Sequence, residues 1–396
     1  MREAAIALHT AGQLTSLHLS IAACGTNFFQ QIAKLPGMSE ISRREYPNEL
    51  SPVLSLHPSR EMVRLLAQRL GMQSLIQHET GWACVDSCYH YFDQKVASHI
   101  ARQKALDSVY AYEDGALQSF AAAKAKGARC IYDLPIAHWQ LSRQILEEES
   151  ERLPAWCQTM TGAMDSDAKR QRKDEELALA DSIICPSQFV ADSIPKSVRL
   201  EKPVHVIPFG SPENIPAPQP RKQHNGKLRV LFAGSMTQRK GLGDLMAAMQ
   251  MLSPEKFELH VLGSPVAPIS FYHEQCPGFI HHAPRPHTEV LKLMQSCDIF
   301  ALPSLVEGRA LVQQEALSCG LPIIVTANAG AQDLVEDGKA GFLVPIRSPQ
   351  VIAEKLEILH HDRDLLKSMQ AAAPLKAASV TWANYRSGIV SAVSRA

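Results

Sequence analysis

The sequence lacks the features that would place it at once among membrane, secreted or nucleic-acid-binding proteins. No apolar run among the 396 residues reaches the ~18 that a transmembrane helix needs. Lys plus Arg equals Asp plus Glu, at 40 each, so we expect no nucleic-acid partner. The first residues show no basic stretch followed by an apolar run, and we therefore expect no secretory signal.

Disulfide and metal frameworks are also missing. The nine cysteines are scattered and odd in number, which favours a reducing cytoplasm over a disulfide-stapled fold. Cys84, Cys88 and His90 are close enough in sequence to suggest metal ligands, but no second ligand pair at zinc-site spacing accompanies them. We favour ordinary buried cysteines in a helix. The composition, with 45% apolar and 20% charged residues, is typical of a globular protein. We expect a cytoplasmic location, with the inner face of a membrane as a second candidate.

A proline-rich stretch divides the chain. Residues 210–226 read GSPENIPAPQPRKQHNG, with four prolines within nine residues. Proline lacks a backbone N–H and fixes φ, so this stretch is neither a helix nor a central strand. We predict an N-terminal domain over residues 1–210, a linker over 211–226 and a C-terminal domain over 227–378. A terminal helix over 379–396 is predicted to pack back on the first domain.

Short apolar runs alternate with segments of helical spacing on both sides of the linker. This alternation predicts parallel sheets covered on both faces. The expected fold is α/β, with two doubly wound domains whose strands end at a shared cleft. Strands are predicted at 108–112, 128–132, 182–185, 204–207, 228–233, 257–262, 299–302, 322–326 and 341–344, and helices at 115–126, 174–180, 242–252, 288–297, 310–319, 331–336 and 351–360.

The start of the first domain departs from this pattern. A doubly wound domain usually opens with a strand and a glycine-containing turn into its first helix. Here residues 3–11 already have helical spacing, and residues 16–22 have the pattern of a strand. We therefore expect the first domain to lack its first strand.

Two glutamates flank a predicted helix start in the C-terminal domain. Glu307 lies in the loop before the helix and Glu315 within the helix, with Gly308 between them. A helix start suits an anion such as phosphate, and carboxylates accept hydrogen bonds from hydroxyls. A nucleotide sugar has hydroxyls at both ends and phosphate in the middle. The alternative is that helix-dipole preference and solvation alone explain the two acids.

A second candidate site is GSMTQRKG, residues 234–241, between a predicted buried strand and a helix. A phosphate-binding turn occupies this place in doubly wound domains. The order of residues excludes a P-loop, because Gly241 follows the lysine. Arg239 and Lys240 supply two positive charges for a diphosphate, although a solvated basic turn would have the same sequence.

These motifs resemble the retaining glycosyltransferases of family 4. The resemblance rests on KG before an apolar helix and on EGRALVQQEALSCGLPIIVTANAGAQDLVEDGKAGFLVP. It is specific from residue 228 to 359, weaker from 107 to 210 and thin before 107. It implies the GT-B fold of two facing Rossmann-like domains.

The resemblance also implies roles for individual residues. Glu307 would hold hydroxyls of the donor sugar, and Glu315 those of the ribose. Arg239 and Lys240 would neutralise the diphosphate, and no metal cofactor would be needed for transfer. The backbone of three further residues would lie near the sugar and the diphosphate, namely Gly308, Arg309 and Ala310.

Two positions depart from the family pattern. Ser235 stands where many members have an arginine, and Arg239 is our candidate for its substitute. The pair Ala329-Gly330 stands where many members have two glycines.

The first domain offers weaker candidates. His138, just after a predicted strand, is a candidate catalytic residue, with a structural histidine beside Trp139 as the alternative. For Asp133 we favour a structural role. The charge run at residues 165–176 is predicted to form a solvated helix face, with peripheral membrane contact as a second interpretation.

The sequence therefore predicts a retaining glycosyltransferase that moves sugar from a nucleotide-diphosphate sugar to a saccharide or lipid-linked acceptor. Such a product would serve cell-surface polysaccharide or glycolipid synthesis. The alternative is a catalytically defective or N-terminally truncated relative that binds the donor nucleotide without transfer. A nicotinamide-dependent enzyme is disfavoured, because Gly241 and Gly243 lack the third glycine of G-x-G-x-x-G.

Overall fold

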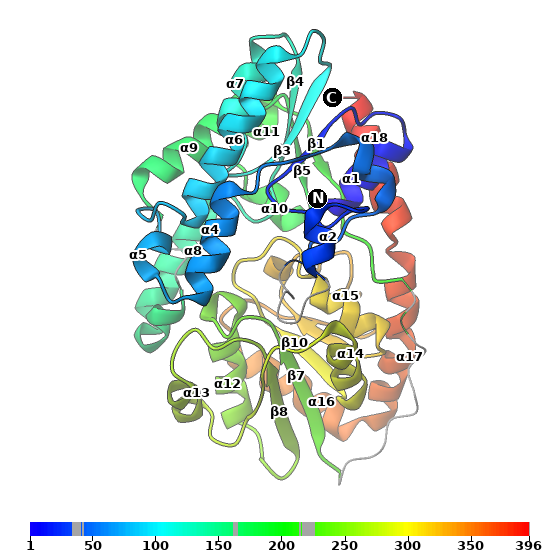
Figure 1. Ribbon diagram of the computed structural model, residues 1–396. Coiled ribbons are helices and arrows are strands. Elements are labelled where there is room, and N and C mark those ends of the chain that lie inside the picture. The colour runs from blue at the N-terminus through cyan, green and yellow to red at the C-terminus, as the bar shows by residue number, and fades with distance from the viewer. Residues whose placement is uncertain (34–40, 42, 161–164, 214, 216–225, 396) are drawn as a thin grey trace.

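The chain is organised around parallel β-sheets in two α/β halves, which lie one above the other in Figure 1. This computed structural model describes residues 1–33, 41, 43–160, 165–213, 215 and 226–395. Most of the predicted linker lies outside the described residues. Within them, no helix is both long and apolar enough to cross a membrane.

The C-terminal half contains a six-stranded parallel sheet in the order β12-β11-β10-β7-β8-β9. The central strands are buried almost completely, which explains why they appear in the sequence as uninterrupted apolar runs. Three predicted strands are confirmed at both ends: β7 (Leu228–Ala233), β8 (Phe257–Leu262) and β10 (Ile299–Leu302). The other strands are β9 (Ile280–His282), β11 (Ile323–Val325) and β12 (Gly341–Leu343).

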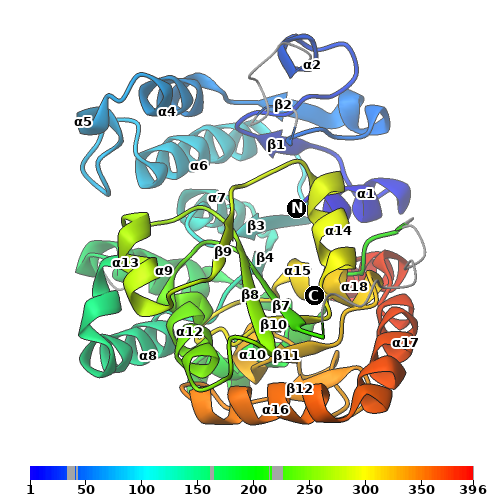
Figure 2. The same ribbon diagram turned by 90° about the horizontal axis from the view of Figure 1, so that it is seen from below.

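Helices cover this sheet (Figure 2). Most of them begin close to their predicted positions. They are α12 (Leu242–Gln250), α13 (Ile269–Gln275), α14 (His287–Ser296), α15 (Leu311–Ser318), α16 (Pro349–His361) and α17 (Arg363–Ser379). The helix predicted at residues 331–336 is wrong. That segment forms a single turn, in which the N–H groups of Leu334 and Val335 both bond to the carbonyl of Ala331. Arg309 holds this turn through Asp333, so tertiary contacts outweigh the helical pattern.

The N-terminal half contains a four-stranded parallel sheet in the order β3-β4-β5-β6. The strands are β3 (Ser108–Tyr112), β4 (Arg129–Asp133), β5 (Ser182–Cys185) and β6 (Val204–Val206). The helices around it are α6 (Val85–Arg102), α7 (Leu117–Lys124), α8 (Trp139–Arg152), α9 (Asp167–Leu179), α10 (Gln188–Ser193) and α11 (Lys196–Glu201).

The first strands of the chain form a sheet of their own. β1 (Leu17–Leu19) follows the short α1 (Arg2–Thr10) and pairs in parallel with β2 (Leu54–Leu56), and α2 (Phe28–Ala33) lies between the two strands in the chain. Among the described residues, no strand pairs this two-stranded sheet with the four-stranded one. The helices α4 (Ser59–Arg69) and α5 (Gln73–Ile76) follow β2.

The charge run in α9 is only in part the solvated face that we predicted, because Asp167 and Glu175 are exposed while other members of the run are buried. The carboxylate of Glu176 is buried and accepts hydrogen bonds from the backbone N–H groups of Asp114, Ala116 and Leu117, at the start of α7. A helix start has unpaired N–H groups that need such acceptors. The run is therefore part of the packing between helices.

The basic residues of this run are paired rather than exposed. Lys169 lies 2.9 Å from Asp86, Arg172 2.8 Å from Asp93 and Lys173 3.2 Å from Glu113. Because each of these cations already has a carboxylate partner, this arrangement does not favour the membrane-contact interpretation.

The last helix, α18 (Trp382–Arg395), lies against α1 in the N-terminal half (Figure 1). Ile389 is fully buried in a cluster with Leu8 of α1 and Ile131 of β4. Where the chain crosses back, a Cβ on Gly210 would lie 2.2 Å from the backbone nitrogen of Trp382. The C-terminal segment is thus part of the N-terminal core.

We expect Ile389→Ala to lower the free energy of unfolding by roughly 2–5 kcal/mol, because it opens a cavity in this core. Leu375→Ala is the matched control, since Leu375 is 74% exposed in α17 and its truncation should cost less than about 0.5 kcal/mol. Urea unfolding of both variants measures the difference. Equal losses would show that α18 is not part of the core.

Candidate functional site

The candidate site centres on the loop between β10 and α15. Thr326 donates a hydrogen bond from Oγ1 to the carbonyl of Ser304 (2.6 Å), and Asn328 donates from Nδ2 to the carbonyl of Leu305 (2.7 Å). Both donors follow the neighbouring strand β11. The loop that carries Glu307 is therefore held by the sheet edge next to it, at the carboxyl ends of the strands.

Glu307 faces the two predicted cations. Its carboxylate contacts the Lys240 ammonium, and its Oε1 lies 3.3 Å from Nη1 of Arg239. Burial raises the pKa of Glu307, but the charges of Arg239 and Lys240 outweigh burial, so the pKa falls below its usual value. The carboxylate is therefore ionised at neutral pH, and the two motifs that the sequence predicted separately meet at one place.

Gly234 makes room for the lysine. Its φ is +150°, and a Cβ at this position would lie 2.9 Å from Cδ of Lys240. The aliphatic part of the lysine thus crosses the backbone directly after β7. The side chain of Arg239 also donates to the carbonyl of Val306 at 2.8 Å. Glycine at residue 234 is needed for this close approach.

Glu315 lies further along α15, on the other side of the helix start. Its Oε1 is 3.2 Å from Nε2 of His287, the first residue of α14. The residue before α15 is Ala310, whose side chain cannot cap the helix. Within the described residues, the N–H groups of Leu311 and Val312 have no hydrogen-bond partner, whereas the Gln313 N–H bonds to the Ala310 carbonyl at 3.1 Å. His287 had no distinguishing signal in the sequence, and only the fold brings it to Glu315.

Gly308 lies where the two halves of the protein touch. A Cβ on Gly308 would lie 1.7 Å from the carbonyl oxygen of Pro135, and Ser187 Oγ donates to the Gly308 carbonyl at 2.7 Å. The Arg309 side chain turns away into the core, where it makes two bonds to Asp333, at 2.6 and 3.0 Å. The Arg309 side chain is thus engaged by Asp333 and does not extend toward Glu307.

His138 is buried at the start of α8. Its Nδ1 accepts from the N–H of Gln140 (3.4 Å), and its Nε2 lies 3.5 Å from Asp174. Burial lowers the pKa of His138 to about 4, so the ring is neutral at pH 7. These contacts join α8 to α9. A catalytic role for His138 stays a prediction.

Asp133 is also buried, at the end of β4. It accepts a hydrogen bond from the hydroxyl of Tyr110. Burial raises the pKa of Asp133 to about 6.

A buried polar network that sequence analysis missed joins α8 to the turn before Lys240. The Glu149 carboxylate is fully buried and accepts from Gln238 Nε2 (2.6 Å), from Arg152 (2.6 and 2.9 Å) and from Arg347 (2.9 Å). Arg152 also reaches Asp244 in α12 at 2.7 Å. Gln238 directly precedes Arg239. One carboxylate of the first half thus fixes the turn that carries both cations of the second.

The potential metal ligands lie elsewhere. Cys84, Cys88 and His90 do not form a cluster of ligand atoms within the described residues, and the Cys84 sulfur instead accepts from the Ser87 N–H. Within the described residues, a group of potential ligand atoms is instead formed by the exposed His78 with Glu79 and Asp165. The Lys169 ammonium lies 3.0 Å from Asp165. A lysine cation therefore already neutralises part of this cluster.

Two triplets of the chain have the D-x-D spacing of metal-dependent glycosyl transfer, residues 165–167 and 362–364. Ser166 caps α9 through Lys169 N–H, and Asp362 caps α17 through Leu365 N–H. The central residue of one triplet and the first residue of the other therefore have a structural role at a helix start.

Comparison with known proteins finds a family similarity in the half of the chain that contains this site. Residues 213–376 match the family model described as Glycosyl transferases group 1. This matched segment, which we call the group 1 domain, is what the chain shares with that family. This domain contains the Arg239–Lys240 turn, the 303–310 loop and α15.

Curated relatives are similar to parts of this chain of different length. D-inositol 3-phosphate glycosyltransferase of Corynebacterium urealyticum is 39% identical over 101 residues, which are 26% of this chain and 24% of the relative. The enzyme of the same name from Corynebacterium diphtheriae is 28% identical over 309 residues, 67% of this chain and 72% of the relative. The chain thus spans about a quarter of the first relative's length.

Solved structures share the fold across both halves. Sucrose-phosphate synthase from Thermosynechococcus elongatus has a TM-score of 0.63 at 16% identity and covers 78% of each chain. Anabaena Alr3699/HepE in complex with UDP has a TM-score of 0.60 at 19% identity, covering 77% of this chain and 82% of its own. The group 1 domain and the N-terminal half together form the expected GT-B fold.

We expect Glu149→Gln to destabilise the protein by about 3–5 kcal/mol, because the amide places a new donor among arginine and glutamine donors and leaves buried charges unpaired. Glu148→Gln is the matched control, since Glu148 neighbours it and also contacts Arg347 (2.8 Å) but is exposed. That variant should unfold like the wild type. Urea midpoints test the pair, and a Glu149→Gln variant as stable as the control would contradict the role of the network.

Proposed function

We propose that this protein is a retaining glycosyltransferase that moves a sugar from a nucleotide-diphosphate sugar to a hydroxyl-bearing acceptor. The observation that carries the proposal is the helix start of α15, with Glu307 and its two cations on one side and Glu315 with His287 on the other. The group 1 domain and the GT-B fold support it. Polysaccharide or glycolipid synthesis is the proposed use, and a relative with such a name is the putative colanic acid biosynthesis glycosyltransferase WcaL of Salmonella typhimurium.

The donor would lie along the carboxyl ends of the strands. Its ribose hydroxyls would bond to Glu315, and its diphosphate would face the uncapped N–H groups of α15. Arg239 and Lys240 would turn from Glu307 toward the phosphates, and Glu307 would then accept bonds from sugar hydroxyls. UDP is the first nucleotide to test, because the HepE structure is a complex with UDP.

Charge separation is the central problem of the proposed transfer. The bond from the sugar C1 to the diphosphate oxygen breaks, which leaves positive charge on the sugar and negative charge on the diphosphate. Cations and helix N–H groups stabilise the departing diphosphate. The acceptor oxygen bonds to C1 on the same face, and its proton passes to a diphosphate oxygen. The two glutamates would bind rather than attack, unlike the carboxylate pairs of glycoside hydrolases.

We expect UDP to raise the thermal midpoint of the wild type, since a ligand bound by the native state alone stabilises it. Glu315→Gln should weaken UDP binding roughly 10- to 100-fold, because it removes a charged acceptor of ribose hydroxyls. Glu336→Gln is the control, since Glu336 is exposed and pairs with Lys339. GDP and ADP tested in parallel identify the base. Undiminished nucleotide binding by Glu315→Gln would overturn the site assignment.

Turnover with whichever nucleotide sugar binds is expected to persist in excess EDTA, because Arg239 and Lys240 supply the positive charge for the diphosphate. Release of nucleotide from the sugar nucleotide, with and without EDTA, measures this. A loss of more than tenfold that Mg²⁺ or Mn²⁺ restores would contradict the metal-free proposal. Nucleotide binding without any turnover would instead favour the catalytically defective relative.

A further inference from the structure

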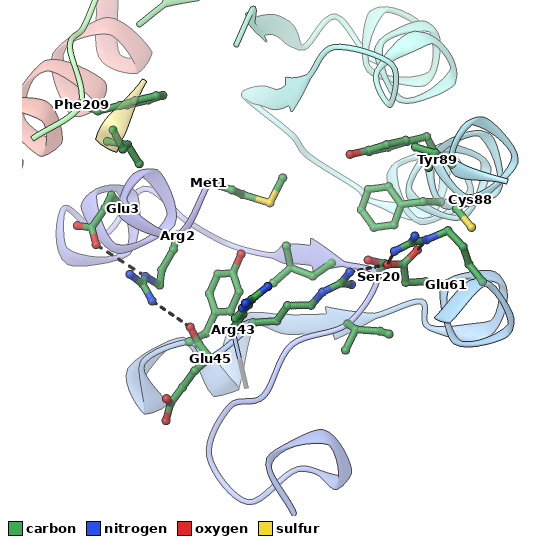
Figure 3. Close-up of a pocket in the computed structure, with 18 of the residues that line it drawn as sticks. Met1, Arg2, Glu3, Ser20, Arg43, Glu45, Glu61, Cys88, Tyr89 and Phe209 are labelled. Atoms are coloured by element: carbon green, nitrogen blue, oxygen red, sulfur yellow. Dashed lines mark hydrogen bonds and ion pairs between the residues drawn. The ribbon is translucent and has the colours of Figure 1, made fainter. Parts of the chain in front are cut away.

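A large cavity lies on the N-terminal side of the proposed donor site. Its volume is about 640 Å³, a size typical of small-molecule sites. α1, the end of β1, α4, α6 and the crossing segment near Phe209 surround it (Figure 3). Leu311, the first residue of α15, also lines it. The cavity therefore opens onto the helix start that would face the donor diphosphate, and no step described so far uses it.

We call this cavity the arginine pocket, because three arginines line one side of it: Arg43, Arg44 and Arg64. Arg64 makes two bonds of 2.8 Å to the Glu61 carboxylate, and Arg44 Nη2 makes a third at 2.6 Å. One carboxylate thus pairs with two guanidinium groups, so this triad has a net positive charge. Glu61 is only 8% exposed, which fixes both arginines in place.

Arg44 keeps donors for a ligand. Its contact to Glu61 involves Nη2, and within the described residues its Nε and Nη1 have no hydrogen-bond partner. Its side chain is 27% exposed, against 16% for Arg64. Because Glu61 uses one N–H of Nη2, the second N–H of Nη2 and that of the neighbouring Nε or Nη1 form a planar fork toward a ligand. Such a fork matches the paired oxygens of a phosphate or carboxylate.

The remaining wall suits a sugar ring. Tyr89 extends from α6 toward the open space of the pocket in Figure 3. Trp382 and Tyr385 line the cavity from α18. Tyrosine and tryptophan combine an apolar face with a polar edge. A ring with apolar faces and hydroxyl edges is complementary to such a wall.

We infer that the arginine pocket binds the acceptor, and that this acceptor is a hydroxyl-bearing molecule with an anionic group held by Arg44 beside the Arg64–Glu61 pair. The inference rests on the proposed transfer function for the identity of the molecule as acceptor. It adds the chemical class, which neither the group 1 domain nor the donor residues specify. The anionic group is a phosphate or a carboxylate, because both present paired oxygens that can accept two hydrogen bonds from a guanidinium.

The test compares sugars that differ in one charged group. Binding of glucose, glucose 6-phosphate and glucuronate is measured by calorimetry, with and without saturating UDP. For the wild type we expect at least one anionic sugar to bind tenfold or more tightly than glucose, as a charge-assisted hydrogen bond allows. Comparison of glucose 6-phosphate with glucuronate shows whether the pocket prefers a phosphate or a carboxylate.

Substitutions test whether Arg44 causes the preference for an anionic sugar over glucose. Arg44→Gln should lose the preference for the anionic sugar, and Arg44→Lys should retain part of it. Arg199→Gln should keep it whole, since Arg199 lies in α11 and does not line the arginine pocket. Arg64 still pairs with Glu61 in the Arg44 variants, and an unchanged thermal midpoint and UDP affinity confirm their folding. An Arg44→Gln variant that keeps the preference overturns the inference.

Two further outcomes separate this inference from the proposed function. Equal binding of all three sugars, or of none, overturns the anionic-acceptor assignment even where UDP binds normally. Inorganic phosphate that binds as tightly as glucose 6-phosphate also overturns it, because the sugar would then contribute nothing. Failure of UDP to bind, with anionic sugars still bound through Arg44, would instead contradict the donor site and leave the pocket's ligand class standing.

Discussion

The rest of the structure depends on one buried carboxylate that joins its two halves. Glu149, at the end of α8, accepts hydrogen bonds from Arg152, Arg347 and Gln238, and Gln238 begins the turn that carries Arg239 and Lys240. A buried carboxylate is costly unless all its acceptors are used, and here four donors use them. The network therefore orients the two halves and positions the proposed phosphate-binding turn at the same time.

The loop before α15 also contacts both halves of the protein. Gly308 contacts the backbone of Pro135, and its carbonyl accepts from Ser187, so the loop lies against the N-terminal half. On one side of the loop Glu307 meets its two cations, and Leu311 reaches the arginine pocket. A donor bound at the helix start and an acceptor bound in the pocket would thus meet across a loop that has little freedom to move.

Much of the C-terminal half was predictable, because buried parallel strands leave uninterrupted apolar runs and the helices between them keep their periodicity. β7, β8 and β10 were predicted to the residue, as were β3 and β5 in the N-terminal half. The N-terminal half was harder. α8 begins where the sequence showed only a histidine and a tryptophan. In α9, Arg172 and Lys173 are largely buried together with carboxylate partners. A charged segment is predicted to be solvated when its partners cannot be identified from the sequence. The pairs join residues dozens of positions apart, which no local spacing reveals.

The sequence by itself determined the α/β class, the positions of most strands in the second half and the residue types of the proposed donor site. These follow from local periodicity and from motifs whose members lie within one loop and helix. Only the tertiary structure decided that Glu307 meets Lys240, that His287 meets Glu315 and that Arg44 and Arg64 share Glu61 beside a cavity. Those contacts depend on which strand ends are neighbours and on how α4 lies against the end of β1, and chain folding alone sets such distances.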